Sequence, residues 1–285
     1  MEKILAIYDI KKVSAVICTW NSIASIRRCI ESLKNNGVGE IIVVDADSDD
    51  GTKDVAFELA DQIVIDLRKG LATARNMGIN VSSGYYIINV GADNVMPLGS
   101  ILRMIEVKEE MGWTGVSAVT SLEQSHKNYF NWAMNLYKPT RYYLGERHVI
   151  GTPSLFEAKI LKNNLFDSAM GHSDDGDLCT RLSRIGCRFG IADVVVGEIG
   201  TDSLNSVLYR WKNYGQSDWE TYSKYSATWN FRRKIYSLIY PLKNELILPF
   251  YKISGYDKIR ILPFLVLITT IRYWYWLKFT TQNKL

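Results

Sequence analysis

Strand-like and helix-like segments alternate through the first ninety residues, and this alternation constrains the fold more than any other feature. The strand-like segments are short apolar runs at residues 13–19, 40–45, 62–66 and 85–90. Between them, apolar residues recur at the three- and four-residue spacing of one helix face, over residues 23–36, 55–60 and 71–81. This repeated order of strand and helix predicts a parallel, doubly wound α/β sheet.

The second half of the chain is less regular. Residues 115–120 and 188–196 are predicted as strands, and residues 178–185 as a helix that ends before Gly186. The aromatic stretch 122–145 fits neither pattern clearly.

At 285 residues and 47% hydrophobic composition, the chain is long and apolar enough for one large or two small packed domains. Its cysteines show neither CxxC pairs nor zinc-ligand spacing, so we expect reduced core thiols in a cytosolic protein. They are Cys18, Cys29, Cys179 and Cys187. Residues 1–7 hold too short an apolar run for a secretory signal, which predicts a cytoplasmic location.

Charge is unevenly distributed along the chain. The net charge is +4, but residues 228–285 carry ten Lys and Arg against Glu245 and Asp257, a balance of +8. Residues 1–227 therefore carry −4. We expect a catalytic body over 1–227 and a separate basic tail over 228–285. Nucleic-acid binding is disfavoured, because the basic excess lies in an aromatic, apolar tail.

A buried-looking strand at residues 85–90 runs directly into the small acidic turn Gly91-Ala92-Asp93-Asn94. Ligands of α/β sheets bind at the carboxyl ends of the strands, and a carboxylate there can hold Mg²⁺ or Mn²⁺ against phosphate oxygens. Alternatively, Asp93 and Asn94 only turn the chain before Pro97, since both residue types favour turns.

Four motifs, in order, resemble those of the family 2 glycosyltransferases of the GT-A fold, over about residues 13–200. They are Thr19-Trp20-Asn21, VVDADSDDGT at 43–52, KGLATARNMG at 69–78 and DDGDLCTRL at 174–182. The resemblance implies a Rossmann-like, doubly wound mixed sheet, followed here by a helical, aromatic and basic tail. It also implies inverting transfer of a sugar from a UDP- or GDP-linked donor to an acceptor hydroxyl.

On the donor side, the resemblance implies contacts with the nucleotide-sugar from Thr19, Trp20, Asn21, Asp45, Arg75, Asn76, Ala92 and Asp93. Metal ligation of Mn²⁺ or Mg²⁺ would rest on Asp93, with Asn94 or water assisting, because Gly91 replaces the first aspartate of the family's DxD motif. From the residues alone, Asp45 could equally form a strand-end turn, and Arg75 could be an ordinary solvated helix residue.

On the acceptor side, the resemblance makes Asp175 the candidate catalytic base. Residues placed near the acceptor or in support of the site are Asp174, His172, Gly151, Arg210 and Trp211. The alternative for Asp174 and Asp175 is a plain helix start after Ser173, favoured by capping and by the helix dipole. Arg210 and Trp211 could close over the diphosphate as a lid, or lie on a basic helix packed on the body.

The tail combines tryptophans, tyrosines and apolar runs with its basic excess, which is typical of a segment lying on an anionic membrane surface. A spanning helix is disfavoured, because the apolar run from Ile261 stops at Ile271, well short of about 20 residues. The tail could instead cover the catalytic core or form a dimer contact. Membrane contact would suit a lipid-linked or cell-surface glycan acceptor.

Two other functions compete with sugar transfer. A sugar-phosphate nucleotidyltransferase also uses a doubly wound sheet, but it would need a glycine-rich, Arg-containing loop after the first strand, which Thr19-Trp20-Asn21-Ser22 lacks. A catalytically degenerate, glycosyltransferase-like binding or scaffolding protein is suggested by Gly91.

Overall fold

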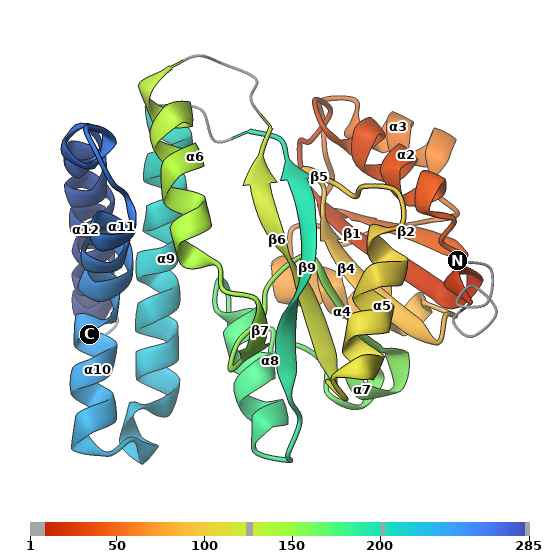
Figure 1. Ribbon diagram of the computed structural model, residues 1–285. Coiled ribbons are helices and arrows are strands. Elements are labelled where there is room, and N and C mark those ends of the chain that lie inside the picture. The colour runs from red at the N-terminus through yellow and green to blue at the C-terminus, as the bar shows by residue number, and fades with distance from the viewer. Residues whose placement is uncertain (1–8, 124–127, 201–202, 283–285) are drawn as a thin grey trace. The chain divides into compact units, whose positions relative to one another are not determined.

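The computed structural model describes residues 9–123, 128–200 and 203–282, which divide into two units (Figure 1). The expectation about residues 1–7 lies outside the described residues. The first unit takes in the chain to Thr120 together with Tyr143–Ala169 and Asp174–Ile199, and the second contains Ser121–Tyr142, Met170–Ser173 and the chain from Gly200. The division differs from the expected boundary after residue 227, because helices on both sides of that boundary pack together.

The described residues of the chain form one nine-stranded mixed sheet, in the order β3-β2-β1-β4-β8-β6-β9-β5, with β7 paired to β9. The strands are β1 (Val13–Thr19), β2 (Glu40–Asp45), β3 (Gln62–Ile65), β4 (Tyr86–Gly91), β5 (Asn94–Val95), β6 (Gly115–Leu122), β7 (Gly145–Arg147), β8 (Ser154–Glu157) and β9 (Phe189–Glu198). The first four are parallel, as predicted, and β8 joins β4 antiparallel. The mixed sheet and a helical C-terminal region confirm the predicted fold class.

Helices cover both faces of this sheet. They are α2 (Ile26–Asn36), α3 (Thr52–Leu59), α4 (Leu71–Val81), α5 (Ser100–Glu110), α7 (Ala158–Asn163) and α8 (Asp174–Ser183), after a short 3₁₀ turn, η1 (Ile10–Lys12). α4 has the predicted bounds, and α2 ends at Gly37, whose φ of 79° suits a residue without a Cβ. α8 begins four residues before its predicted start, because an acidic first turn favours a helix start without adding apolar periodicity.

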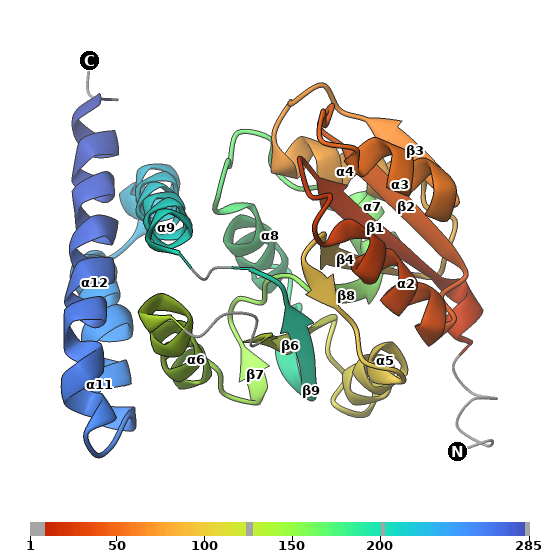
Figure 2. The ribbon, with the colours of Figure 1, turned by 90° about the horizontal axis from the view of Figure 1, so that it is seen from above.

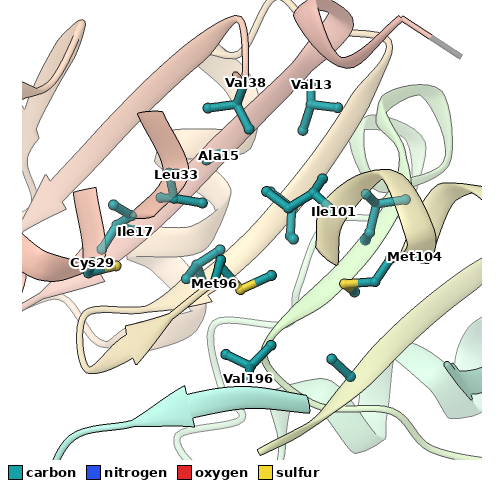
Figure 3. Close-up of a cluster of buried hydrophobic side chains, with 14 of the residues drawn as sticks. Val13, Ala15, Ile17, Cys29, Leu33, Val38, Met96, Ile101, Met104 and Val196 are labelled. Carbon is teal, nitrogen blue, oxygen red and sulfur yellow. The ribbon is translucent and has the colours of Figure 1, made fainter. Parts of the chain in front are cut away.

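Two cores lie on opposite faces of the sheet, since successive strand residues point to opposite sides. Figure 3 shows one of them, where Ile17 of β1, Leu33 of α2 and Met104 of α5 point toward one another. The other core is formed by residues of α4, α7 and α8. Close packing of α4 on the sheet requires a glycine, because a Cβ on Gly78 would lie 2.4 Å from Val16 Cγ1.

The second unit is helical. Its elements are α6 (Tyr129–Arg141), α9 (Leu204–Tyr225), the 3₁₀ turn η2 (Ser226–Thr228), α10 (Phe231–Pro241), the π-helical turn η3 (Leu242–Ile247), α11 (Leu248–Lys252) and α12 (Asp257–Gln282). α6 lies within the stretch 122–145 that the sequence pattern left unassigned. Within this unit, α12 runs beside α6 and α9 (Figure 2). None of the described helices combines the length and the apolar character needed to cross a bilayer.

A charged cluster is buried in the helical unit. The carboxylate of Glu245 is fully buried and accepts hydrogen bonds from Arg141 Nη1 at 2.7 Å and from Trp211 Nε1 at 3.1 Å. Tyr137 and Arg272 also donate to it. Arg272, which interrupts the apolar run of the tail, therefore points inward, and α12 continues past it to Gln282.

Candidate active site

The first turn of α8 carries two neighbouring carboxylates, Asp174 and Asp175. Arg75 of α4 binds both: its Nη1 donates to Asp174 Oδ2 at 2.6 Å and to Asp175 Oδ1 at 2.8 Å. The side chains of Arg75 and Asp174 are 7% and 4% exposed, whereas 27% of the Asp175 side chain is exposed. One carboxylate of the pair is therefore buried, and the other is accessible from solvent.

The chain just before β8 completes this cluster. Thr152 Oγ1 accepts a hydrogen bond of 2.7 Å from Arg75 Nη2. Gly151 lies beside Asp175, because a Cβ added to Gly151 would be 3.6 Å from Asp175 Oδ2. The structure thus brings Gly151, Arg75, Asp174 and Asp175 together. They come from three segments that are far apart in the sequence.

The environment of Asp175 makes it a stronger base than an ordinary aspartate. Burial raises the pKa of Asp175 to about 6; the Arg75 cation opposes this rise and the neighbouring Asp174 adds to it. A carboxylate with a pKa near the working pH is ionised at pH 7 and well suited to accept a proton. Cys18, near the same cluster, offers no nucleophile, since burial raises the pKa of its thiol to about 12.

The side chains of Arg75 and Asn76 are both engaged in contacts within the protein. The guanidinium of Arg75 is occupied by the two carboxylates and Thr152, and it stacks over the Phe166 ring with 5.1 Å to the centroid. The Asn76 amide donates to Phe166 O at 2.8 Å and accepts from Phe166 N at 2.9 Å. Through their contacts with Phe166, both side chains hold the loop that follows α7.

Asp45 is buried at the end of β2. Its carboxylate has no exposed surface, and its oxygens accept from the N–H and the hydroxyl of Ser48, each at 2.7 Å. These hydrogen bonds form a strand-end turn, the arrangement that the residues alone allow beside a nucleotide contact. The expected contact of Asp45 with the nucleotide-sugar stays a prediction.

Exposed residues next to these turns are better placed for a ligand. The described non-glycine residues with positive φ are Asn21, Asp47, Leu67 and Arg68, and all lie in the turns that follow β1, β2 and β3. Such strained backbone gathers at functional sites. Trp20 is 53% exposed, and the guanidinium of Arg68 lies 5.1 Å from the centroid of its ring.

A pocket opens at the carboxyl end of β2. Its lining residues are Asp47, Ser48, Asp49, Gly51, Lys53, Asp54 and Arg68. Asn21 joins the β1 and β2 turns, since its N–H donates to Ser48 Oγ at 2.9 Å and its Oδ1 accepts from Asp49 N at 3.1 Å. Thr19, at the end of β1, is buried, and its hydroxyl has no partner among the described residues. The pocket offers cations for phosphates and acceptors for a base or ribose.

Asp93 lies just after β4 and is half-buried, while Ala92 packs into the core. The segment is held by Ile199 N, which donates to Asp93 O at 2.8 Å, and by Asn94 Oδ1, which accepts from Gly91 N at 3.0 Å. Across the described part of the chain, no three His, Cys, Asp or Glu side chains gather as a metal site. A single carboxylate fits Mg²⁺ or Mn²⁺ only where substrate phosphates complete the coordination.

Three expected residues belong to the helical unit. The backbone N–H of the exposed His172 donates to Glu220 Oε2 at 3.0 Å, and Arg210 is half-buried on α9. Trp211 is fully buried against Tyr137 and Phe264, and movement as a lid would require that core to open.

The chain matches the family model described as "Glycosyl transferase family 2" over residues 14–165, slightly more than half its length. The chain belongs to glycosyl transferase family 2. The match covers the strands, turns and helices that carry Trp20, Arg75 and Asp93, and it confirms the resemblance read from the motifs.

Curated relatives of this family 2 glycosyltransferase match only a short segment. An uncharacterized glycosyltransferase of Rickettsia bellii is 36% identical over 83 residues, which are 29% of this chain and 28% of that protein. The putative glycosyltransferase EpsH of Bacillus subtilis is 33% identical over 89 residues, 29% of this chain and 26% of EpsH. The matched segments thus span little more than a quarter of these relatives.

Solved structures share the fold along nearly the whole chain. The mannosyltransferase PcManGT of Pyrobaculum calidifontis, in complex with GDP-Man and Mn²⁺, has a TM-score of 0.62 at 17% identity, covering 95% of this chain and 86% of PcManGT. TarS of S. aureus (residues 1–349), in complex with UDP-GlcNAc, has a TM-score of 0.56 at 12% identity, covering 93% and 89%. These likenesses establish the GT-A fold of this glycosyltransferase.

The motifs missed several residues that build the site. Thr152 and Phe166 position Arg75, and Arg68 lines the pocket at the carboxyl end of β2. Arg68-Lys69 follows the third strand, at the sheet edge where such folds bind ligands, which is a signal for Arg68. Thr152 directly follows Gly151 in the sequence. Nothing in the local sequence marks Phe166.

Proposed function

We propose that this family 2 glycosyltransferase moves a sugar from a nucleoside-diphosphate sugar to an acceptor hydroxyl with inversion at the anomeric carbon. The observation that carries the proposal is the exposed edge of Asp175. Its Oδ1 is held by Arg75, its Oδ2 lies beside Gly151, which carries no side chain, and 27% of the Asp175 side chain is exposed.

Asp175 would act as the general base. Its Oδ2 takes the proton of the acceptor hydroxyl as that oxygen attacks the anomeric carbon from the face opposite the diphosphate. The new C–O bond forms while the bond to the diphosphate breaks, and the nucleoside diphosphate leaves with the electron pair. Proton transfer of this kind is typically worth about 10² to 10⁴ in rate.

The donor nucleotide would bind at the carboxyl ends of β1 to β3. The Trp20 ring offers a stacking face for the base, and Arg68 and Lys53 are cations within reach of that pocket. Both UDP and GDP are candidates, because the pocket offers carboxylate acceptors that the N–H groups of either base can use. UDP-GlcNAc and GDP-mannose are the first donors to test.

Asp93 would hold Mg²⁺ or Mn²⁺, which as a Lewis acid would offset the charge that develops on the departing diphosphate. The single carboxylate makes metal binding depend on the nucleotide. We therefore expect weak metal binding by the protein alone and stronger metal binding with the diphosphate present.

The acceptor would be a lipid-linked or cell-surface glycan, reached at the cytoplasmic face of a membrane on which the protein lies peripherally. The basic, aromatic helices of residues 228–285 support this placement.

Two variants test the reaction. Asp175→Asn should abolish release of nucleoside diphosphate from the donor while leaving nucleotide affinity within about twofold, because the amide cannot take the proton. Asp93→Ala should remove the metal dependence of nucleotide binding in calorimetry. Absence of UDP and GDP binding with Mn²⁺ present would count against the reaction and favour the degenerate binding protein that Gly91 suggests.

A further inference from the structure

The helix α10 has an apolar face that its own unit leaves uncovered. At about 100° per residue, five apolar side chains fall within an arc of about 100°. They are Phe231, Ile235, Leu238, Ile239 and Leu242, and all five are exposed. α10 touches the unit through its other side, where Lys234 and Ser237 are half-buried and Pro241 is buried.

The helix α12 repeats this arrangement. One of its faces packs into the unit through residues such as Ile261, Phe264 and Ile268. The opposite face has a second row of exposed apolar side chains. The row comprises Ile259, Leu262, Val266, Trp274 and Leu277. A groove lined by Leu262, Pro263, Val266, Leu267 and Thr270 lies along it.

Basic residues border both rows. By helical position on α10, Arg232 borders the apolar arc on one side and Lys234 on the other. Lys243 is exposed in the η3 turn that follows α10. On α12, Arg260 and Lys278 share one border. A helix with an apolar face bordered by cations is the form that lies in a bilayer interface, with its apolar side chains among the acyl chains and its cations at the head groups.

The acidic residues of this region do not balance these cations. Of the two in residues 228–285, Glu245 is fully buried with Arg141 and Arg272, and Asp257 is half-buried in the first turn of α12. The exposed surface of α10 and α12 is therefore apolar and positively charged. A second copy of the chain would bring like charges together, whereas an anionic lipid surface is complementary to both features.

We propose that the apolar rows of α10 and α12, hereafter the lipid-binding rows, seat the protein on an anionic phospholipid surface. The exposed Trp274 is suited to such a surface, because tryptophan concentrates at the interface between head groups and acyl chains. The helices would lie in the interface rather than cross it. This inference deepens the proposed membrane contact and rests on it, but it does not depend on sugar transfer.

The test is co-sedimentation of the full chain, without donor, with vesicles of phosphatidylcholine alone or with about 30% phosphatidylglycerol. We expect binding to the anionic vesicles that weakens as salt is raised. The double variant Leu238→Glu/Ile239→Glu and the variant Val266→Glu should each weaken binding at least about tenfold. Arg232→Gln/Lys243→Gln should weaken it by about fivefold per charge. Glutamate suits exposed helix positions, so folding should be retained.

The matched control is Phe57→Glu, at an exposed apolar residue on α3 of the first unit, which should leave vesicle binding unchanged. The proposal is overturned if neither vesicle binds, or if binding persists in the α10 and α12 variants. A change from dimer to monomer in those variants, without vesicle binding by the parent protein, would instead show a contact between copies. Nucleotide binding is measured on the same samples. Loss of vesicle binding with nucleotide binding retained would count against the lipid-binding rows alone and not against the proposed reaction.

Discussion

Replacing Arg75 by methionine should destabilise the first unit strongly, and the loss should depend on pH. Methionine keeps most of the side-chain volume and helix propensity but removes the cation. Two adjacent carboxylates, Asp174 at 4% and Asp175 at 27% exposure, would then remain without the guanidinium that binds both. The hydroxyl of Thr152 would lose its donor as well.

Removing one partner of a buried ion pair typically costs about 3–5 kcal/mol, because the remaining charge stays buried without a partner. We expect a loss in this range at pH 8. Burial already raises the pKa of Asp175 to about 6, and loss of the opposing Arg75 cation would raise it further above the unfolded value near 4. The folded variant would then hold protons that the unfolded chain has released, so its stability falls as pH rises through that interval. At pH 5 the loss should be clearly smaller.

The assay is urea unfolding at pH 5 and pH 8, followed by hydrogen exchange at β1 and β4, which reports on the first unit alone. Arg75→Lys is the control, since lysine keeps the positive charge but lacks the planar guanidinium that binds several acceptors at once. Its loss of unfolding free energy should lie between zero and the loss in Arg75→Met. A loss below about 1 kcal/mol at pH 8, or equal losses at both pH values, would refute the reasoning.

Three further outcomes are expected. The value of kcat/KM should rise with pH and level off above an apparent pKa near 6, the value to which burial raises the pKa of Asp175; a flat profile from pH 5 to 8 would contradict its role as base. Asn76→Ala should lower the free energy of unfolding by about 2 kcal/mol, because two hydrogen bonds to Phe166 are lost, while nucleotide affinity in calorimetry changes little. Gly91→Asp should weaken Mn²⁺-dependent nucleotide binding rather than strengthen it, since a Cβ there would lie 2.6 Å from Asp93 Oδ1; tighter binding would disprove this.

The first half of the fold could be predicted because its signals are local. The bounds of α4 follow from apolar spacing, and the end of α2 follows from Gly37. Apolar spacing predicts the start of α8 four residues too late, because the acidic first turn of this helix has no apolar residue to begin the helical pattern. α6 was left unassigned because aromatic residues dominate it, and these favour strands about as readily as buried helices.

The site could be predicted only in part, because its decisive contacts join distant residues. Arg75 and Asp175 are 100 positions apart, and no spacing rule connects them. The motif predicts a functional role for Arg75, but it does not predict that the guanidinium faces Asp174 and Asp175 rather than solvent. For Asp45, both interpretations begin from the same residues, and the hydrogen bond from the Ser48 hydroxyl depends on a turn geometry that the sequence does not specify.

A common feature links three residues of the first unit. Arg75, Asn76 and Asp45 are polar side chains at the carboxyl edge of the sheet, where three turns and a helix start must be held without regular secondary structure. Buried polar groups must be satisfied by hydrogen bonds, so these side chains bind the backbone and one another. In the proposed reaction, contact with substrate would then fall to exposed neighbours such as Trp20 and to the exposed edge of Asp175. Substitutions of the buried set should therefore reduce stability first, whereas substitutions of the exposed set should change substrate affinity or turnover with little change in stability.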